Sequence, residues 1–268
     1  MRINGLNYHV EAHGAGEALV LLHGFTGSSA NWLATVNAFA DQFRVVSIDL
    51  LGHGQTDSPP NPDRYRMKPA AADLIAVFDV LGLETVTLVG YSMGARLTLY
   101  AALTYPSRIH RLILESGSPG LKTQAERNAR IASDEALAER IEREGIAAFA
   151  DYWTNIPLFA TQPPEVRKRL HDQRLANNPS GLANSLRGMG TGVQPALWDR
   201  LGELTLPTLL TCGELDTKFR AINVEMRDLI PNSTLVVIPG AGHTTHAEQP
   251  ALFRAEVLHF LELDHRPR

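Results

Sequence analysis

The sequence has little cysteine, no long hydrophobic run and no excess of positive charge. Its one cysteine, Cys212, excludes an internal disulfide framework and fits a reducing compartment. Cys212 ends an apolar run, so we interpret it as a packed core residue. No segment approaches the ~20 apolar residues that a membrane-spanning helix needs, and no stretch of signal-peptide character follows Met1. We therefore expect a cytoplasmic protein without a membrane span.

The net charge of -4 argues against nucleic acid as the partner, because binding nucleic acid usually demands a basic field. The hydrophobic fraction of 44% and the charged fraction of 20% are ordinary for a soluble globular protein. A chain of 268 residues fits one large α/β domain that has room for an insertion.

Short apolar runs alternate with longer helix-like stretches through the first half of the chain. The runs are predicted as strands of a parallel sheet covered on both faces: Ala18–Leu22, Arg44–Ile48, Val86–Val89 and Ile109–Leu114. The stretches between them are predicted as helices: Trp32–Ala40, Ala70–Leu81 and Ala95–Leu103. This alternation predicts a doubly wound α/β sheet with right-handed crossovers. A Gly-rich turn between Leu6–Glu11 and Ala18–Leu22 predicts an antiparallel hairpin at one edge.

The alternation is interrupted in the second half. Between about Ser118 and Glu203 we predict no strand, only the helices Asp134–Glu144, Glu165–Leu175 and Gly181–Leu186. The closing elements are the strands Leu206–Cys212 and Leu235–Ile238 and a helix over Pro250–Glu262. A helical insertion between later strands is most simply a cap over the carboxyl ends of the sheet, where such folds place ligands. We therefore expect a core of residues 1–117 and 205–268 and a helical cap of residues 118–204.

The segment Gly90-Tyr91-Ser92-Met93-Gly94 lies between a predicted strand and a predicted helix. Gly-x-Ser-x-Gly in that setting predicts a nucleophile elbow, a tight turn that raises the serine hydroxyl above the sheet. The glycines are needed because side chains would collide across the strained turn. We therefore predict Ser92 as the reactive residue.

The partners that Ser92 needs follow it in the order acid, histidine. A neutral serine is a weak nucleophile or base, so a histidine must take its proton and a carboxylate must fix the tautomer of that histidine. Asp216 and His243 lie on loops that follow predicted strands, and we assign these roles to them. The alternatives are Glu214, which is disfavoured by its closeness to the strand end, and His246, which is expected to begin the closing helix.

The segment His23-Gly24-Phe25 follows the strand Ala18–Leu22. After a nucleophile elbow, an oxyanion hole takes one backbone N–H from this place and another from the residue after the nucleophile. We assign these donors to Phe25 and Met93. We interpret His23 as an orienting residue instead of a second base, and His53, in a sharp turn, as structural. Together these features predict the α/β-hydrolase fold.

Arg96 lies four residues after Ser92, so on a helix it occupies the same face one turn further on. An ordinary lipase-like site would be lined by apolar groups instead. In the predicted cap, Arg130, Arg174 and Arg187 have few opposite charges beside them in the sequence. Because a guanidinium suits bidentate binding of a carboxylate, these residues predict a small polyanionic acid as substrate.

Over essentially the whole chain the sequence resembles the 2-succinyl-6-hydroxy-2,4-cyclohexadiene-1-carboxylate synthases, the pyruvate-eliminating enzymes of menaquinone biosynthesis. Strings shared with many hydrolases are His23–Phe25, Gly90–Gly94 and Gly242–His243. More specific strings are Leu114–Leu121, Glu126–Arg130 with Asp134 following, Gly181–Gly192 and Gly213–Phe219. The cap strings carry the most weight, because caps vary freely between activities in this fold.

The resemblance implies a lyase that releases pyruvate from a substrate with three carboxylates by 2,5-elimination, without a metal or organic cofactor. The carboxylate-binding arginines of the family fall on Arg96, Arg130 and Arg174, and its pocket aromatic residues on Tyr91 and Trp153. In the family the activated serine acts as a base instead of an acylated nucleophile. The oxyanion-hole donors would then stabilise an enolate oxygen as they would a tetrahedral oxyanion.

Two arginines are left open. Arg187 is either a substrate ligand or a cap-packing residue, and Arg127, on the same helix face as Arg130, is either a second contact or a surface charge. The rival function is a serine hydrolase of esters or C–C bonds in carboxylated substrates, which has little use for three buried guanidiniums. A non-catalytic binding protein is disfavoured because all three members of the predicted triad are present.

Overall fold

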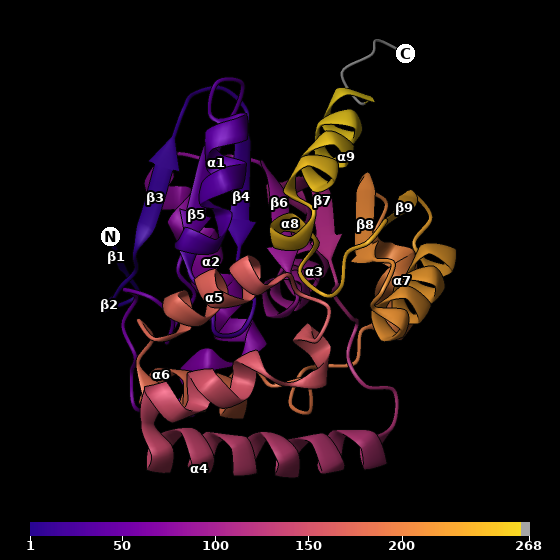
Figure 1. The fold of residues 1–268 in the computed structure, drawn as a ribbon. Helices are drawn as coiled ribbons and strands as arrows, with labels where there is room; N and C mark the ends of the chain where they lie inside the picture. The colour runs from indigo at the N-terminus through magenta and orange to yellow at the C-terminus, as the bar shows by residue number, and fades with distance from the viewer. Residues whose placement is uncertain (264–268) are drawn as a thin grey trace.

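The computed structural model describes residues 1–263 and is built around a seven-stranded sheet (Figure 1). Its strands are β3 (Val10–His13), β4 (Ala18–Leu22), β5 (Arg44–Ile48), β6 (Val86–Tyr91), β7 (Ile109–Glu115), β8 (Thr208–Gly213) and β9 (Ser233–Ile238). They lie in the order β3-β5-β4-β6-β7-β8-β9, and every neighbouring pair is parallel except β3 with β5. The predicted doubly wound, mostly parallel sheet is confirmed.

The predicted hairpin between Leu6–Glu11 and Ala18–Leu22 is wrong. β3 pairs antiparallel with β5, and β4 lies between β5 and β6 with a parallel neighbour on each side. The reason is burial: every residue of β4 is buried and suits the middle of the sheet, whereas β3 is partly exposed and suits its edge. The first residues instead form a separate small hairpin of β1 (Arg2–Ile3) and β2 (Leu6–Asn7).

Helices cover both faces of the sheet. They are α1 (Leu33–Phe39), α2 (Met67–Leu81), α3 (Met93–Thr104), α7 (Thr217–Leu229), the short α8 (Thr245–Glu248) and α9 (Pro250–Leu263). On β4, Leu19 and Leu21 belong to one apolar cluster with α1 and α9, whereas Val20 and Leu22 belong to a second cluster with α2 and α3. The strand alternation thus divides the core in two, and the loops after the strands remain free to form a site.

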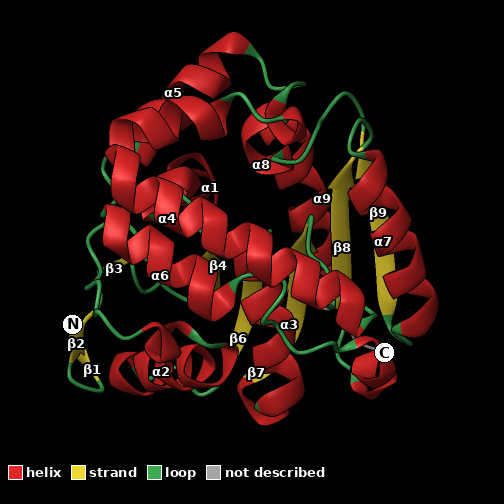
Figure 2. Ribbon diagram, turned by 90° about the horizontal axis from the view of Figure 1, so that it is seen from below, coloured by secondary structure: helices red, strands yellow, loops and turns green. Residues whose placement is uncertain are grey.

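Three further helices, α4 (Gln124–Thr154), α5 (Pro164–Arg174) and α6 (Pro179–Met189), lie across one end of the sheet. Figure 2 looks onto this end and shows α4 and α6 side by side in front of the strands. The helix predicted at Asp134–Glu144 is only the middle of α4, which begins at a capping box of Thr123 and Glu126. The helical path is broken at Gly145, whose φ of 79° suits a residue without a Cβ.

The other predicted elements lie close to their observed positions, and β4 and β5 have the predicted bounds. No helix was predicted over Thr217–Leu229, where the structure has α7. Its signal was available: Asp216 accepts a hydrogen bond from the backbone N–H of Phe219 as an N-cap, and Phe219, Ile222 and Met226 then recur at helical spacing. Among residues 1–263, no helix has the length and apolar character needed to cross a membrane.

Candidate active site

Ser92 lies in the tight turn between β6 and α3. Its φ of 51° is unusual for a residue with a side chain and marks stored backbone strain. A Cβ on Gly90 would come within 2.5 Å of the Gly94 backbone, and a Cβ on Gly94 would collide with the carbonyl oxygen of Leu22. Both glycines are therefore required for the turn that presents Ser92 beyond the end of the sheet.

Ser92, His243 and Asp216 form a continuous hydrogen-bonded line. The Oγ of Ser92 is 3.0 Å from Nε2 of His243, and Nδ1 of His243 is 2.6 Å from Oδ2 of Asp216. Asp216 is buried, and its other carboxylate oxygen accepts the Phe219 N–H that caps α7. One carboxylate thus fixes both the imidazole and the start of a helix, and the geometry suits proton transfer from Ser92 to His243.

The two alternatives to this line have other contacts. Glu214 accepts a hydrogen bond from the Gly240 N–H on the exposed side of the loop that carries His243. His246 lies within α8, as expected, and its Nδ1 is 2.7 Å from the buried carboxylate of Glu115. Neither side chain approaches Ser92 in a contact that could replace Asp216 or His243.

The backbone N–H groups predicted for the oxyanion hole belong to Phe25, in the loop after β4, and to Met93, directly after Ser92. Phe25 and Met93 both line the cavity into which Ser92 opens. Met93 is the first residue of α3, so its N–H has no helical carbonyl to donate to. The N–H of Met93 is therefore free to donate to an oxygen above Ser92, while the role of the Phe25 N–H stays a prediction.

His23 and His53 are buried side by side behind this loop, and the Asp49 carboxylate lies close enough to His23 to raise its pKa against the larger effect of burial. The Nε2 of His23 accepts the Leu50 N–H, and its Nδ1 is 2.8 Å from the Gly24 carbonyl oxygen. Burial lowers the pKa of His23, and it lowers the pKa of His53 to about 3. A neutral His23 with both ring nitrogens engaged holds two loops together, which is the orienting arrangement predicted for it.

A cavity of about 270 Å³ opens above Ser92 between the end of the sheet, the cap helices α4 and α6, and the first turns of α7. Its floor is formed by Ser92, Met93 and His243, and its walls mix apolar with cationic groups. The lining residues outside the floor include Phe25, Arg96, Ser118, Leu121, Arg130, Trp153, Ile156, Leu186, Met189, Thr191, Lys218, Phe219 and Ile222. Of these, Lys218, Phe219 and Ile222 were missed as site residues because α7 was not predicted.

Arg96 extends into this cavity from α3. Its NH1 donates to the Met189 carbonyl oxygen at 2.7 Å and to Oε1 of Gln194 at 3.1 Å, and both acceptors are neutral. Burial lowers the pKa of Arg96 to about 10, and the nearby Arg130 guanidinium adds to that effect. The group stays charged at neutral pH, so an anion in the cavity would find a guanidinium whose charge is not matched by its partners.

Arg130 reaches the same cavity from α4 but has a charged partner. Its Nε donates to Oδ1 of Asp134 at 2.7 Å, one helical turn away. Burial raises the pKa of Asp134, while Arg130 and Arg96 oppose that rise. The cluster of two guanidiniums and one carboxylate leaves one net positive charge facing the cavity.

Arg174 and Tyr91 line a smaller hollow of about 20 Å³ that shares Phe25 with the main cavity. The Arg174 side chain is buried over the Phe159 ring and donates to the hydroxyls of Thr26 and Thr154. Burial lowers the pKa of Arg174 to about 10. Arg174 is thus a second buried guanidinium with neutral partners, and it lies beside the main cavity instead of within its lining.

Trp153 and Tyr91, the two predicted pocket aromatics, occupy different places. Trp153 lines the main cavity and stacks on Phe149 in α4, with its ring 5.3 Å from that of Phe25. The hydroxyl of Tyr91 bonds to that of Thr244 at 2.9 Å, beside His243, and burial raises the pKa of Tyr91.

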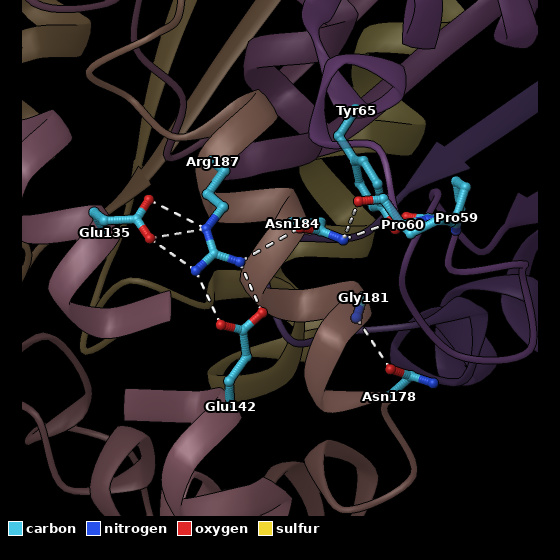
Figure 3. Close-up of polar contacts among 9 residues, drawn as sticks. All are labelled: Pro59, Pro60, Tyr65, Glu135, Glu142, Asn178, Gly181, Asn184 and Arg187. Atoms are coloured by element: carbon cyan, nitrogen blue, oxygen red, sulfur yellow. Dashed lines mark hydrogen bonds and ion pairs between the residues drawn. The ribbon is translucent and has the colours of Figure 1, made fainter. Parts of the chain in front are cut away.

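The structure places Arg187 and Arg127 outside the cavity lining. Arg187 on α6 makes ion pairs with Glu135 and Glu142 of α4, which Figure 3 shows on either side of its guanidinium. Arg127 donates to the Leu121 carbonyl oxygen and to Gln124 near the start of its own helix. Both guanidiniums already donate to protein oxygens, which favours the alternatives left open for them, cap packing for Arg187 and a surface charge for Arg127.

Metal ligation finds no support in the arrangement of side chains. Within residues 1–263 there is no group of three or more histidine, cysteine or acidic side chains that could hold a metal ion.

A parallel sheet under a helical cap, with serine, histidine and aspartate in line beyond its strands, defines the α/β-hydrolase class. The model of the α/β-hydrolase fold family matches residues 17–250. Within that class, a protein of Bacillus subtilis (strain 168) that carries the name 2-succinyl-6-hydroxy-2,4-cyclohexadiene-1-carboxylate synthase provisionally is 50% identical over 96% of both chains. The chain belongs to the family of these synthases.

Further relatives agree. The 2-succinyl-6-hydroxy-2,4-cyclohexadiene-1-carboxylate synthase of Photorhabdus laumondii is 36% identical over 91% of this chain and 85% of its own. The solved structure of MenH from S. aureus matches with a TM-score of 0.91 at 36% identity, over 97% of this chain and 99% of that one. The resemblance and the fold class predicted from the sequence are thereby confirmed.

Proposed function

We propose that the chain is a carbon–oxygen lyase that eliminates pyruvate from 2-succinyl-5-enolpyruvyl-6-hydroxy-3-cyclohexene-1-carboxylate. The product is 2-succinyl-6-hydroxy-2,4-cyclohexadiene-1-carboxylate, the compound named in its relatives. The partner is a small polycarboxylate and not nucleic acid, in keeping with the net charge of -4. The single cysteine supports a cytoplasmic location.

In this proposal Ser92 is the base and His243 its activator. His243 takes the Ser92 hydroxyl proton as Ser92 Oγ removes the ring proton α to the succinyl ketone, and Asp216 stabilises the resulting imidazolium. The electron pair moves onto the ketone oxygen, where the N–H groups of Phe25 and Met93 stabilise the enolate. As the enolate collapses, the ring double bond shifts and the C–O bond to the enolpyruvyl group breaks. The departing enolpyruvate takes the proton held by His243 and leaves as pyruvate, which restores neutral His243 and the Ser92 hydroxyl.

The observation that carries the proposal is the charge around Ser92. The cavity above it is bounded by Arg96 and Arg130, and the hollow beside it holds Arg174. Arg96 and Arg174 hydrogen-bond only to neutral groups among the described residues. Removing two such guanidiniums from water, Arg174 fully and Arg96 in part, is costly unless anions bind them, and a substrate with three carboxylates supplies those anions.

The decisive experiment measures pyruvate release from the succinyl-enolpyruvyl cyclohexene substrate. We expect release well above spontaneous decay, and a fall of roughly 10³-fold or more in Ser92→Ala, because members of a triad act as a unit. Ser233→Ala, which removes a hydroxyl from β9 outside the cavity lining, is the matched control and should keep parental turnover. Unchanged turnover in Ser92→Ala would show that the site assignment is wrong.

A serine hydrolase remains the second candidate, because the same line of residues could acylate Ser92. An esterase from Thermogutta terrifontis, solved with malate bound, is 29% identical with a TM-score of 0.85, so carboxylate binding and ester hydrolysis occur together on this fold. Aryl esters of dicarboxylic acids separate the two readings. We expect their hydrolysis to be far slower than pyruvate release, and the opposite ranking would favour the hydrolase.

A further inference from the structure

Two buried carboxylates, Glu115 and Glu248, lie behind His243 and take no part in the hydrogen-bonded line to Ser92. Buried carboxylates are costly unless their oxygens are satisfied. Their partners therefore show what they hold in place.

The carboxylate of Glu248 accepts hydrogen bonds from the backbone on both sides of His243. Its Oε2 accepts the Gly242 N–H at 2.8 Å, and its Oε1 accepts the Thr244 N–H at 2.9 Å. A carboxylate can accept at both oxygens, whereas an amide of the same size offers one acceptor and would turn N–H donors toward the second backbone N–H. The site is thus built for the ionised form of Glu248.

The local sequence is arranged to let Glu248 approach. A Cβ on Gly242 would come within 3.0 Å of Oε2 of Glu248 and would also collide with the Thr161 hydroxyl. The hydroxyl of Ser116 donates to the His243 carbonyl oxygen at 2.9 Å. The peptide groups on either side of His243 are therefore held from β7 and from α8 at once.

Glu115 holds the helix that carries Glu248. Its carboxylate accepts from the Thr245 hydroxyl, from the His246 N–H and, at 2.7 Å, pairs with Nδ1 of His246. These contacts fix α8 against the end of β7. The position of Glu248 is thereby tied to the sheet that also carries Ser92.

We infer that Glu248 is a positioning residue for the proposed elimination: it holds the His243 imidazole in line with Ser92, and its negative charge stabilises the imidazolium formed when Ser92 loses its proton. The inference rests on the proposed function for its catalytic meaning. Burial raises the pKa of Glu248, and the N–H groups of Thr244 and Gly242 oppose that rise. His243 also lowers the pKa of Glu248, as expected for attraction between the carboxylate and the imidazole.

Other charged or titratable groups also face this loop and stay in place in the test. They are Tyr91 of β6, Glu115 of β7, Arg174 of α5, Cys212 of β8, Asp216 and Lys218 at the start of α7, and His246 of α8. None of these side chains is replaced in the variants, so a shift of the pH profile that is absent from the matched control reports the charge removed at Glu248.

The experiment compares Glu248→Gln and Glu248→Asp with the parent by pyruvate release across pH. For the Gln variant we expect kcat to fall roughly 10- to 100-fold with KM within about twofold, because a misplaced base slows the chemical step. We also expect the midpoint of the acid limb of kcat to move down by about one unit, because the lost charge no longer favours the imidazolium. The Asp variant keeps the charge but cannot span both N–H groups, so its kcat should fall while its acid limb stays near the parental one.

Glu214→Gln is the matched control, since Glu214 binds the Gly240 N–H of the same loop from its exposed side. It should leave kcat within about twofold and the acid limb in place. The inference is overturned if Glu248→Gln keeps both the kcat of the parent and the parental midpoint of the acid limb. If Glu248→Gln does not fold, a parental kcat in Glu248→Asp overturns the inference instead. If the parent releases no pyruvate, the proposed function fails, and NMR titration of the His243 imidazole in parent and Gln variant still decides the inference by the same downward shift.

Discussion

The arginines around the cavity differ in what their guanidiniums contact. Acidic side chains pair with Arg130 and Arg187. Arg127 donates to the carbonyl oxygen of Leu121, six residues before it. Arg96 and Arg174 bond to neutral oxygens, and burial lowers the pKa of each to about 10. Arg96 shares the nearby Asp134 carboxylate with Arg130, so its charge is only partly balanced, and Arg174 has only neutral hydrogen-bond partners among the described residues. We therefore expect the free energy of these two side chains to change most when an anion binds.

Arg96→Ala tests this difference at the residue scale. We expect KM for the tricarboxylate substrate to rise by about 10- to 100-fold, the loss of one charge-assisted hydrogen-bonded pair, with a smaller change in kcat. Arg127→Ala, an arginine of α4 outside the cavity lining, should keep the parental KM. An unchanged KM together with a lowered melting temperature in Arg96→Ala would mean that Arg96 is purely structural.

Sequence reasoning located the residues that sit on loops after strands, because parallel strands bring those loops to one edge. Ser92, Asp216 and His243 lie together for that reason. The role of Arg187 could not be decided from the sequence. Its partners Glu135 and Glu142 are far away in the chain and meet it only when α4 and α6 pack together. Charge spacing along a sequence does not show which carboxylate folding will bring to a guanidinium.

At the scale of elements, Arg187 joins α6 to α4. Its guanidinium donates to both oxygens of Glu135 and to both oxygens of Glu142, and it is only partly exposed. Burial of Ala138, Ile141 and Leu182 in the same contact shows that the ion pairs close the edge of an apolar seam. The contact fixes the helix that carries Arg130 and Asp134 over the cavity.

Arg187→Met should loosen this seam without removing a substrate contact. We expect a loss of about 1 kcal/mol in the free energy of unfolding, since the pairs are bidentate but partly solvated, and a KM close to that of the parent. Arg143→Met, which removes an exposed arginine paired only with its neighbour Glu144, should change neither quantity. Chemical denaturation and pyruvate release measure both, and a large rise in KM for Arg187→Met would restore it as a ligand.

The elements themselves were predictable where one local signal dominated. Continuous apolar runs identified β4 and β5 with their observed bounds. The pairing of β3 was not predictable from its neighbour in sequence, because the burial of β4 gives it two parallel partners and sends β3 to the edge beside β5. Helix α4 extends well beyond the amphipathic segment Asp134–Glu144 that was predicted, because its start has a capping box and its last turns bury Phe149 and Ala150.

At the scale of the whole molecule, charge is distributed unevenly. The chain carries a net charge of -4, yet Arg96, Arg130 and Lys218 all line one cavity. Helices α3, α4 and α7 therefore concentrate positive potential in the cavity above Ser92, although the chain as a whole is acidic. The fold brings this about by joining segments that are distant in sequence.

The core behind the site makes the whole fold sensitive to acid. His53 is buried, and its imidazole ring packs against the rings of His23 and Phe25. Within the described residues its Nε2 has no hydrogen-bond partner. Burial lowers its pKa from 6.5 to about 3, and burial also lowers that of His23. Because the unfolded chain binds these protons more readily, stability is fully present above pH 6.5 and is lost as the pH falls from there toward 3.

Because His53 binds a proton in the unfolded chain but not in the folded one, it alone should lower the free energy of unfolding by about 2 kcal/mol between pH 7 and pH 5. Urea unfolding at both pH values measures this loss in the parent and in His53→Gln, whose amide keeps a donor for the Leu51 carbonyl oxygen without a titrating group. The variant should start less stable at pH 7, because a neutral, well-packed imidazole is lost, and should fall less steeply with acid. Parallel losses in the two proteins would show that His53 becomes protonated within the folded state and does not drive the acid sensitivity.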